Sequence, residues 1–208
     1  RKWSTYYGGT LHDIAAAVCT DNSGRVMMWG HSESSTGIAT TNAYQNFNAG
    51  QFDVFVAVFD SLGVRQWGTY YGDTQTEEGL AITTDASNNI FVGGFSLSTF
   101  NIATNNSHQQ TSGGQQDGFI AKFPPSGNSL SWATYYGGGG NDQCTTLKLT
   151  SNGTLFAAGT TASSTNISTN GSYQPSMGSA DDAFLVRFDA AGVRQWGTYV
   201  GGNDVDYI

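Results

Sequence analysis

An acidic residue follows a glycine-containing corner at several places along the chain, and these residues could bind a metal ion. They are Asp13, Glu77 or Glu78, Asp142 and Asp204. The third corner, Gly137–Asp142, matches the Gly-Gly-x-Gly-x-Asp pattern of calcium-binding β-rolls. Carboxylate and backbone carbonyl oxygens are the ligands that Ca²⁺ prefers. Asp13, Asp142 and Asp204 are therefore candidate calcium ligands.

The same acidic residues have a simpler interpretation as hydrogen-bond acceptors at a turn. Calcium-binding β-rolls repeat their motif roughly every nine residues, whereas the full pattern occurs once in this chain. A short acidic side chain readily accepts hydrogen bonds from the backbone N–H groups of a turn. The turn interpretation is favoured, and no cofactor other than calcium is expected.

The residues that usually carry catalysis are scattered along the sequence. No two of the histidines, His12, His31 and His108, have the spacing of metal ligands. The two cysteines, Cys19 and Cys144, are expected to be unpaired. The sequence contains no Gly-x-Ser-x-Gly nucleophile elbow and no Walker-type phosphate loop. We therefore expect no enzymatic activity from this chain.

A second acidic set, Asp53, Asp117 and Asp182, opens three similar apolar segments. Because each acid has the same place relative to its segment, a structural role in tying down a loop is favoured over a ring of ligands. Long polar loops precede these segments, and binding sites are often built on loops. The candidate contact residues on these loops are Ser34, Ser35, Thr36, Tyr44, His108 and Tyr173.

A tryptophan-tyrosine segment recurs along the chain and defines a repeat, so each of these residues can be given a position within that repeat. Its copies begin at Trp3, Trp67, Trp132 and Trp196, with spacings of 64, 65 and 64 residues. A fixed period of this length indicates a repeat architecture. The repeats are residues 1–66, 67–131 and 132–195, and residues 196–208 begin a fourth. The tryptophans are expected to pack between repeats, with stacking on sugar rings as the alternative.

Each repeat contains about four segments with the character of β-strands. Segments such as Val54–Phe59 are rich in β-branched and aromatic residues. Several are apolar on both faces, which indicates that both faces are covered. The sequence therefore predicts an all-β fold, a β-propeller in which each repeat is one four-stranded blade of a single domain. Gly30, Gly94 and Gly159 are the small residues expected where blades converge and space is tight. A β-solenoid, with rungs of roughly 20–30 residues, fits the period less well.

The combination of motifs resembles a known repeat family. Trp3–Gly9, Ile90–Gly94 and Asp182–Phe188 are similar to the successive segments of the SBBP-type β-propeller repeat of bacterial exported proteins. The resemblance covers essentially the whole chain. It implies a propeller, commonly of about seven blades, in secreted or cell-surface proteins, and it transfers no catalytic residues. Thr150 and Pro124 depart from the pattern, because the other repeats have aspartate at these positions.

Charge and composition argue against two classes of partner, nucleic acids and the interior of a membrane. Charged residues make up 12% of the chain, against about a quarter in average proteins, and the net charge is −8. This argues against a nucleic-acid partner, which requires a basic surface. No apolar run is long enough to insert into a membrane. The low charge and the polar, uncharged loops suggest a protein that is secreted or held at the bacterial cell surface.

The expected function is that of a non-enzymatic scaffold. Three repeats and part of a fourth do not complete a ring, so we expect the chain to belong to a larger polypeptide or assembly. The expected partner is another surface protein or a glycan that meets the loops. The alternatives are a glycan-binding adhesion module, or a polysaccharide-cleaving propeller enzyme whose site lies in blades outside this sequence.

Overall fold

The computed structural model describes residues 2–178 and 180–206, which form twelve strands and no helix. The strands make three four-stranded sheets. The first contains β1 (Asp13–Thr20), β2 (Val26–Ser32), β3 (Asp53–Phe59) and β4 (Arg65–Tyr71); the second contains β5 (Glu77–Thr84), β6 (Ile90–Ser96), β7 (Asp117–Phe123) and β8 (Trp132–Tyr136); the third contains β9 (Asp142–Leu149), β10 (Leu155–Thr161), β11 (Asp182–Phe188) and β12 (Arg194–Val200). The predicted all-β class is confirmed, and the described strands form three four-stranded antiparallel sheets.

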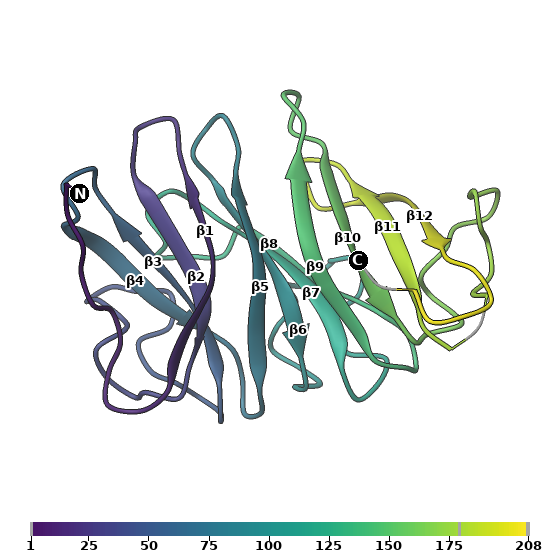
Figure 1. The fold of residues 1–208 in the computed structure, drawn as a ribbon, viewed down its shortest axis with the longest axis horizontal. Helices are drawn as coiled ribbons and strands as arrows, with labels where there is room; N and C mark the ends of the chain where they lie inside the picture. The colour runs from purple at the N-terminus through teal and green to yellow at the C-terminus, as the bar shows by residue number, and fades with distance from the viewer. Residues whose placement is uncertain (1, 179, 207–208) are drawn as a thin grey trace.

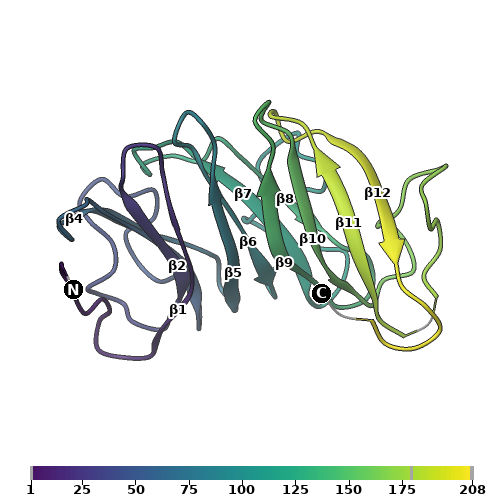
Figure 2. The same ribbon diagram turned by 45° about the horizontal axis from the view of Figure 1, so that its top comes forward.

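The three sheets lie side by side in the order of the chain (Figure 1). Every sheet is antiparallel and keeps its strands in sequence order. The first strands of the sheets face one another, since β5 contacts both β1 and β9. Figure 2 shows β5 between these two strands. The described part of the chain contains no helix of the length and hydropathy needed to cross a membrane.

The sheets are offset from the sequence repeats. The segment containing Trp67, taken as the first strand of a repeat, is β4 and completes the sheet before it. The boundaries at residues 67 and 196 therefore fall within β4 and β12, and the boundary at residue 132 falls at the start of β8. The physical reason is the short turn from β3 to β4, where the N–H of Gly63 donates to the carbonyl of Asp60 over 3.0 Å and Gly63 has φ +83°. This turn makes β3 and β4 a hairpin, whereas the residues after Tyr71 cross to the next sheet.

The first two strands of each sheet approach closely at a bulge. In the second sheet the register shifts between Gly79 and Ala81, opposite Gly94 of β6. A Cβ atom at Gly94 would overlap the carbonyl oxygen of Glu78. The equivalent glycines, Gly30 and Gly159, meet a carbonyl oxygen in the same way. Space is tight at these three positions, as expected, but the close neighbour is the adjacent strand of the same sheet rather than another sheet.

Apolar side chains fill the space between neighbouring sheets. Trp29 of the first sheet is fully buried, contacts Phe119 edge-to-face at 6.3 Å between ring centroids, and donates its Nε1–H to the carbonyl of Gly93 over 3.1 Å. Trp67 and Trp132, two of the repeated tryptophans, also pack between sheets, whereas Trp196 packs on Phe156 of its own sheet. A Cβ on Gly127 would meet the ring of Trp67, so this glycine of the second sheet lies directly against a tryptophan of the first.

The loop between the second and third strands runs along the outer strand of its own sheet. In the first sheet the N–H of Thr40 donates to the carbonyl of Gly68 over 2.9 Å, and the N–H of Tyr70 donates to the carbonyl of Gln45 over 3.1 Å. The other two sheets repeat these bonds, with Thr104 and Gln109 on Ala133 and Tyr135, and with Thr169 and Gln174 on Gly197 and Tyr199. Each loop thus covers the free edge of the fourth strand, where a fifth strand would otherwise pair.

Candidate functional site

The glycine-containing corners end in carboxylates that accept hydrogen bonds from groups of the same corner. Asp142, the first residue of β9, is fully buried. It accepts the N–H of Gly138 over 2.9 Å, the hydroxyl of Ser163 over 2.7 Å and the hydroxyl of Thr161. Asp13 and Glu77 begin β1 and β5 and accept equivalent backbone and serine donors. These are the contacts of the turn interpretation, in which the carboxylate stabilises the corner.

The structure identifies which acidic residue belongs to each corner. At the second corner it is Glu77, which is fully buried and accepts the N–H of Asp73 over 2.8 Å. At the fourth corner it is Asp206 rather than Asp204, because the N–H of Gly202 donates to Asp206 over 2.6 Å. Residues 2–178 and 180–206 contain no group of three or more His, Cys, Asp or Glu side chains arranged to hold a metal ion.

The second acidic set anchors the long loops, as the sequence predicts. Asp117 is fully buried and accepts the Nε2–H of Gln109 over 2.6 Å and the N–H groups of Gly113 and Gly114 over 2.9 and 3.1 Å. Gln109 in turn accepts the N–H of Gly137, where the chain leaves β8. The same aspartate–glutamine pair recurs as Asp53 with Gln45 and as Asp182 with Gln174.

Two buried carboxylates meet around one glycine where the chain leaves each of the first two sheets. A Cβ on Gly72 would lie 2.5 Å from Oε2 of Glu77 and 2.6 Å from Cγ of Asp53. Burial raises the pKa of Asp53 to about 7, the neighbouring Glu77 charge adds to this, and the hydrogen bonds to Asp53 partly offset it. Burial likewise raises the pKa of Asp142 to about 6 and raises the pKa values of Glu77 and Asp117.

We expect the chain to be more stable at about pH 5 than at about pH 8. A carboxyl whose folded-state pKa is raised binds its proton more tightly in the folded state, so stability rises as pH falls through about 7 for Asp53 and about 6 for Asp142. Burial lowers the pKa of His108 to about 4, which opposes this rise below the ordinary histidine pKa. Thermal unfolding across this range, with Asp53→Asn expected to flatten the profile, measures the effect. A melting temperature that rises with pH in both proteins would contradict it.

Adjacent tyrosines on the outer strands fix loops on two sides. Tyr135 donates its hydroxyl to the carbonyl of Ser98 in its own sheet over 2.7 Å. Tyr136 points the other way, packs against Phe184 and donates to the carbonyl of Ile167 in the next sheet over 2.6 Å. Tyr136 therefore joins the second sheet to the third. Val200 occupies the equivalent position in β12.

Replacing Tyr136 by phenylalanine is expected to lower the free energy of unfolding by about 1–2 kcal/mol. The ring remains, but the buried carbonyl of Ile167 loses its donor. Chemical denaturation followed by tryptophan fluorescence measures the loss. Tyr173→Phe is the matched control, because Tyr173 is 88% exposed and its replacement should change little. Equal stabilities for Tyr136→Phe and the unmodified chain would show that this bond is not stabilising.

The loop residues singled out from the sequence lie in different environments. Ser34 is buried and donates its hydroxyl to Asp13, so it belongs to a corner and not to a contact surface. Ser35 and Thr36 are exposed. The three aromatic positions are equivalent: Tyr44 packs on Tyr71 and Phe123, and His108 packs on Tyr136 and Phe188, whereas Tyr173 is exposed on the third sheet.

The other reactive side chains lie apart. His12 is 3.4 Å from Glu33 at the surface, and His31 packs edge-on against Phe52. Cys19 and Cys144 are unpaired, as expected. Burial raises the pKa of the Cys144 thiol to about 12, which keeps this thiol protonated at neutral pH.

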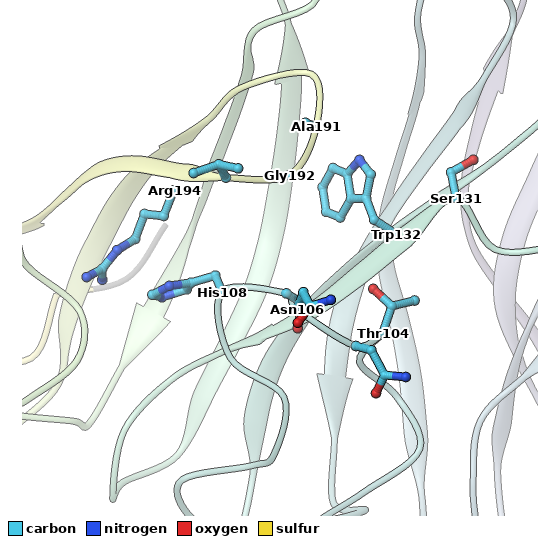
Figure 3. A pocket seen from close by; sticks show the side chains of 11 residues that line it. Thr104, Asn106, His108, Ser131, Trp132, Ala191, Gly192 and Arg194 are labelled. Atoms are coloured by element: carbon cyan, nitrogen blue, oxygen red, sulfur yellow. The ribbon is translucent and has the colours of Figure 1, made fainter.

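A groove opens at the outer rim between the second and third sheets (Figure 3). Its volume is about 630 Å³, and its walls are residues 104–108 of the β6–β7 loop, Ser131 and Trp132, and residues 191–194 of the β11–β12 turn. An equivalent groove of about 570 Å³ lies between the first two sheets, lined by residues 39–43, 65–67 and 126–128. The groove is therefore a repeated feature of the junctions between sheets.

Several polar groups of the groove already have partners within the chain. Arg194 donates to the carbonyl of Asn166 over 2.9 Å, and the hydroxyl of Thr104 donates to the carbonyl of Ala133 over 3.1 Å. Gly192 lies against the ring of Trp132, which also stacks on Phe188 at 6.3 Å, so this indole serves packing. His108 and Arg194 lie on the opposite side of the groove from Trp132 (Figure 3). The burial of His108, helped by the charge of Arg194, lowers the pKa of this imidazole to about 4 and keeps it neutral.

Sequence reasoning found only part of this groove. It selected His108, but it missed Asn106 and Arg194, which lie on two different sheets. One signal in the sequence was the recurrence of Asn42, Asn106 and Gly171 at equivalent positions of the three loops. Asn and Gly favour the left-handed region, and Asn42 and Asn106 have φ values of 65° and 62° there. A scan with protein-family models finds no match to the chain, and a search of curated proteins finds no relative.

Proposed function

We propose that this chain is part of an exported β-propeller and acts as a scaffold that binds other proteins through the grooves at its outer rim. The observation that carries the proposal is the recurrence of one groove at both junctions between sheets, with volumes of about 630 and 570 Å³. Repeat proteins commonly bind partners through surfaces built from equivalent positions of successive units. The motifs shared with SBBP-type repeats and the low content of charged residues support a place at the bacterial surface.

The walls of the groove are held in place before any partner binds. Thr104 is bonded to the outer strand β8, and Gln109 is bonded to Asp117. A rigid binding surface loses little conformational entropy on association, which favours affinity. The buried acids therefore contribute to binding indirectly, because they fix the loop that carries Asn106 and His108.

The groove offers hydrogen-bonding groups suited to a polypeptide backbone. The Asn106 amide can both donate and accept hydrogen bonds, and Arg194 adds a positive charge and the donors that its bond to the carbonyl of Asn166 does not use. A peptide segment with an acidic side chain would match this combination. Glycan binding is the second candidate, because the asparagine and hydroxyl groups of residues 104–107 could also bond sugar hydroxyls.

Selection from a displayed peptide library, run in parallel with a glycan array, tests the proposal. The informative variant is Asn42→Gly with Asn106→Gly, since glycine keeps the left-handed backbone found at these positions. Selected peptides should bind this variant at least about tenfold more weakly than the unmodified chain. Ser87→Ala, on the exposed β5–β6 turn, should bind them normally. Peptides that bind all three proteins equally would overturn the rim grooves as the binding surface, and hits on the glycan array alone would favour the second candidate.

A further inference from the structure

The turns between the first two strands of each sheet lie along one edge of the molecule, at the top of Figure 1. They are residues 21–25, 85–89 and 150–154. Each turn has the same length, and its fourth residue has a positive φ. Because the three backbones are equivalent, differences between the turns come from the side chains that they present to one another.

The first two turns are bonded directly to each other. The side chain of Asn22 donates to the carbonyl of Ala86 over 3.3 Å, and the N–H of Asn22 donates to Oδ1 of Asn88 over 3.2 Å. The Asn88 amide also donates to the hydroxyl of Ser23 over 3.0 Å. Two asparagine side chains therefore cross the junction between the first and second sheets at this edge.

The junction between the second and third turns lacks both of these asparagines. Ala86 has the place of Asn22, and Gly153 has the place of Asn88. A groove of about 410 Å³ lies at this junction, lined by Asn22, residues 84–87 and residues 149–153. The groove is thus a local break in the repeat, since the side chains that cross the first junction are replaced by smaller ones at the second.

The groups that line the groove are mainly neutral and polar. Ser151 and Asn152 are exposed on the third turn, and Asn22 is exposed on the first. Hydroxyl and amide groups both donate and accept hydrogen bonds. Asp85 is the one charged residue in the described lining of the groove, and Nζ of Lys122 lies 3.8 Å from its Oδ2. Because this cation offsets the carboxylate, the groove suits a neutral ligand.

A neutral sugar matches this lining. Its hydroxyls both donate and accept hydrogen bonds, as do the side chains of Ser151 and Asn152. Ala86 and Leu149 supply apolar contact for the C–H groups of a sugar ring. A peptide fits less well, because extended peptides pair with strand edges and this groove is formed by turns. The volume lies within the range of small-molecule sites, about 300–1,000 Å³.

We propose that the groove between the second and third turns, here called the inner groove, binds a short neutral segment of a glycan. Its walls come from three sheets, so the site exists only in the folded chain. The inner groove shares no lining residue with the rim grooves. Glycan binding here is therefore independent of whether the rim grooves bind a partner.

An array of neutral glycans and their sialylated forms, probed with the full chain, tests the class of ligand. Neutral forms should be preferred, because a carboxylate lines the inner groove. In NMR titrations the best neutral glycan should shift the amide signals of residues 84–88 and 149–153. An array without a neutral hit, a preference for the sialylated forms, or signals that shift only elsewhere would overturn the proposal.

Closing the inner groove tests the site directly. Ala86→Asn with Gly153→Asn, the closed variant, gives the second junction the two amides of the first. Asparagine tolerates the left-handed backbone, and an added Cβ at Gly153 meets only the Cβ of Ala190, at 3.7 Å. The closed variant should keep or raise its melting temperature and bind the selected glycan at least about tenfold more weakly. Gly24→Asn, the same substitution on the first turn, should bind normally, because its added Cβ meets nothing within 4 Å.

Two further variants separate this site from a folding defect and from the rim grooves. Ser151→Ala should weaken glycan binding about threefold or more without changing the melting temperature, because Ser151 is exposed. The rim variant, Asn42→Gly with Asn106→Gly, should bind the glycan normally. Equal binding by the closed variant and the unmodified chain, or binding that only the rim variant loses, would overturn the proposal.

Discussion

Replacing Gly94 by alanine is expected to cost at least about 3 kcal/mol of folding free energy, or to prevent folding. The added Cβ would overlap the carbonyl oxygen of Glu78 and lie 3.2 Å from Cα of Gly79. Both atoms belong to the backbone of β5, which is bonded along β6, so neither can move without breaking the ladder. Denaturant unfolding followed by circular dichroism measures the loss.

Gly139→Ala is the matched control for this prediction. Gly139 has no atom within 4 Å of its added Cβ and is not among the glycines with positive φ. Its replacement should change the free energy of unfolding by less than about 0.5 kcal/mol. If Gly94→Ala and Gly139→Ala unfolded at the same denaturant concentration, the close approach of β5 and β6 would be wrong.

Asp117→Ala is expected to destabilise the chain by about 3–5 kcal/mol. The substitution removes the acceptor of three donors, namely Nε2 of Gln109 and the N–H groups of Gly113 and Gly114, at a fully buried position. Each buried donor left without a partner costs about 1–3 kcal/mol. The loop that carries His108 should also become more mobile, which amide hydrogen exchange of residues 104–114 would detect.

The control for Asp117→Ala is Asp181→Ala. Asp181 lies just before β11 and is partly exposed, and its carbonyl, which the substitution keeps, accepts the N–H of Asp206. A change of less than about 0.5 kcal/mol is expected. Comparable losses for the two substitutions would mean that the buried network around Asp117 does not stabilise the loop.

The strands and their period were predictable because they depend on local patterns. Alternating β-branched and aromatic residues define segments such as Val54–Phe59, and the spacing of the tryptophans defines the unit. The anchoring role of Asp117 was predictable for the same reason, since an acid that recurs at a fixed place serves the repeated structure. These features require no knowledge of which segments meet in space.

The division of the chain into sheets was not predicted correctly, because it depends on how neighbouring strands connect. Both ends of the segment containing Trp67 carry glycine, at Gly63 and Gly72. Only the first glycine belongs to a hairpin turn, so Trp67 joins the sheet before it. The prediction of Asp204 at the fourth corner was wrong although the repeat spacing could have corrected it. The separation of Tyr71 from Glu77, and of Tyr136 from Asp142, leads from the equivalent Val200 to Asp206.

The rim groove could not be predicted from the sequence, because its walls come from distant segments. His108, Trp132 and Arg194 lie on two sheets and meet only when those sheets pack. Once a groove is known at one junction between sheets, the repeat period predicts an equivalent groove at the next junction. The period alone does not predict that any junction has a groove.

The loops that run along the outer strands have a consequence for how the protein behaves at high concentration. An exposed strand edge is a template for other chains and a common start of aggregation. Here the bonds from Thr40, Thr104 and Thr169 already occupy the outer edges of β4, β8 and β12. A protein built this way can be extended by further sheets without adding unpaired strand edges at its rim.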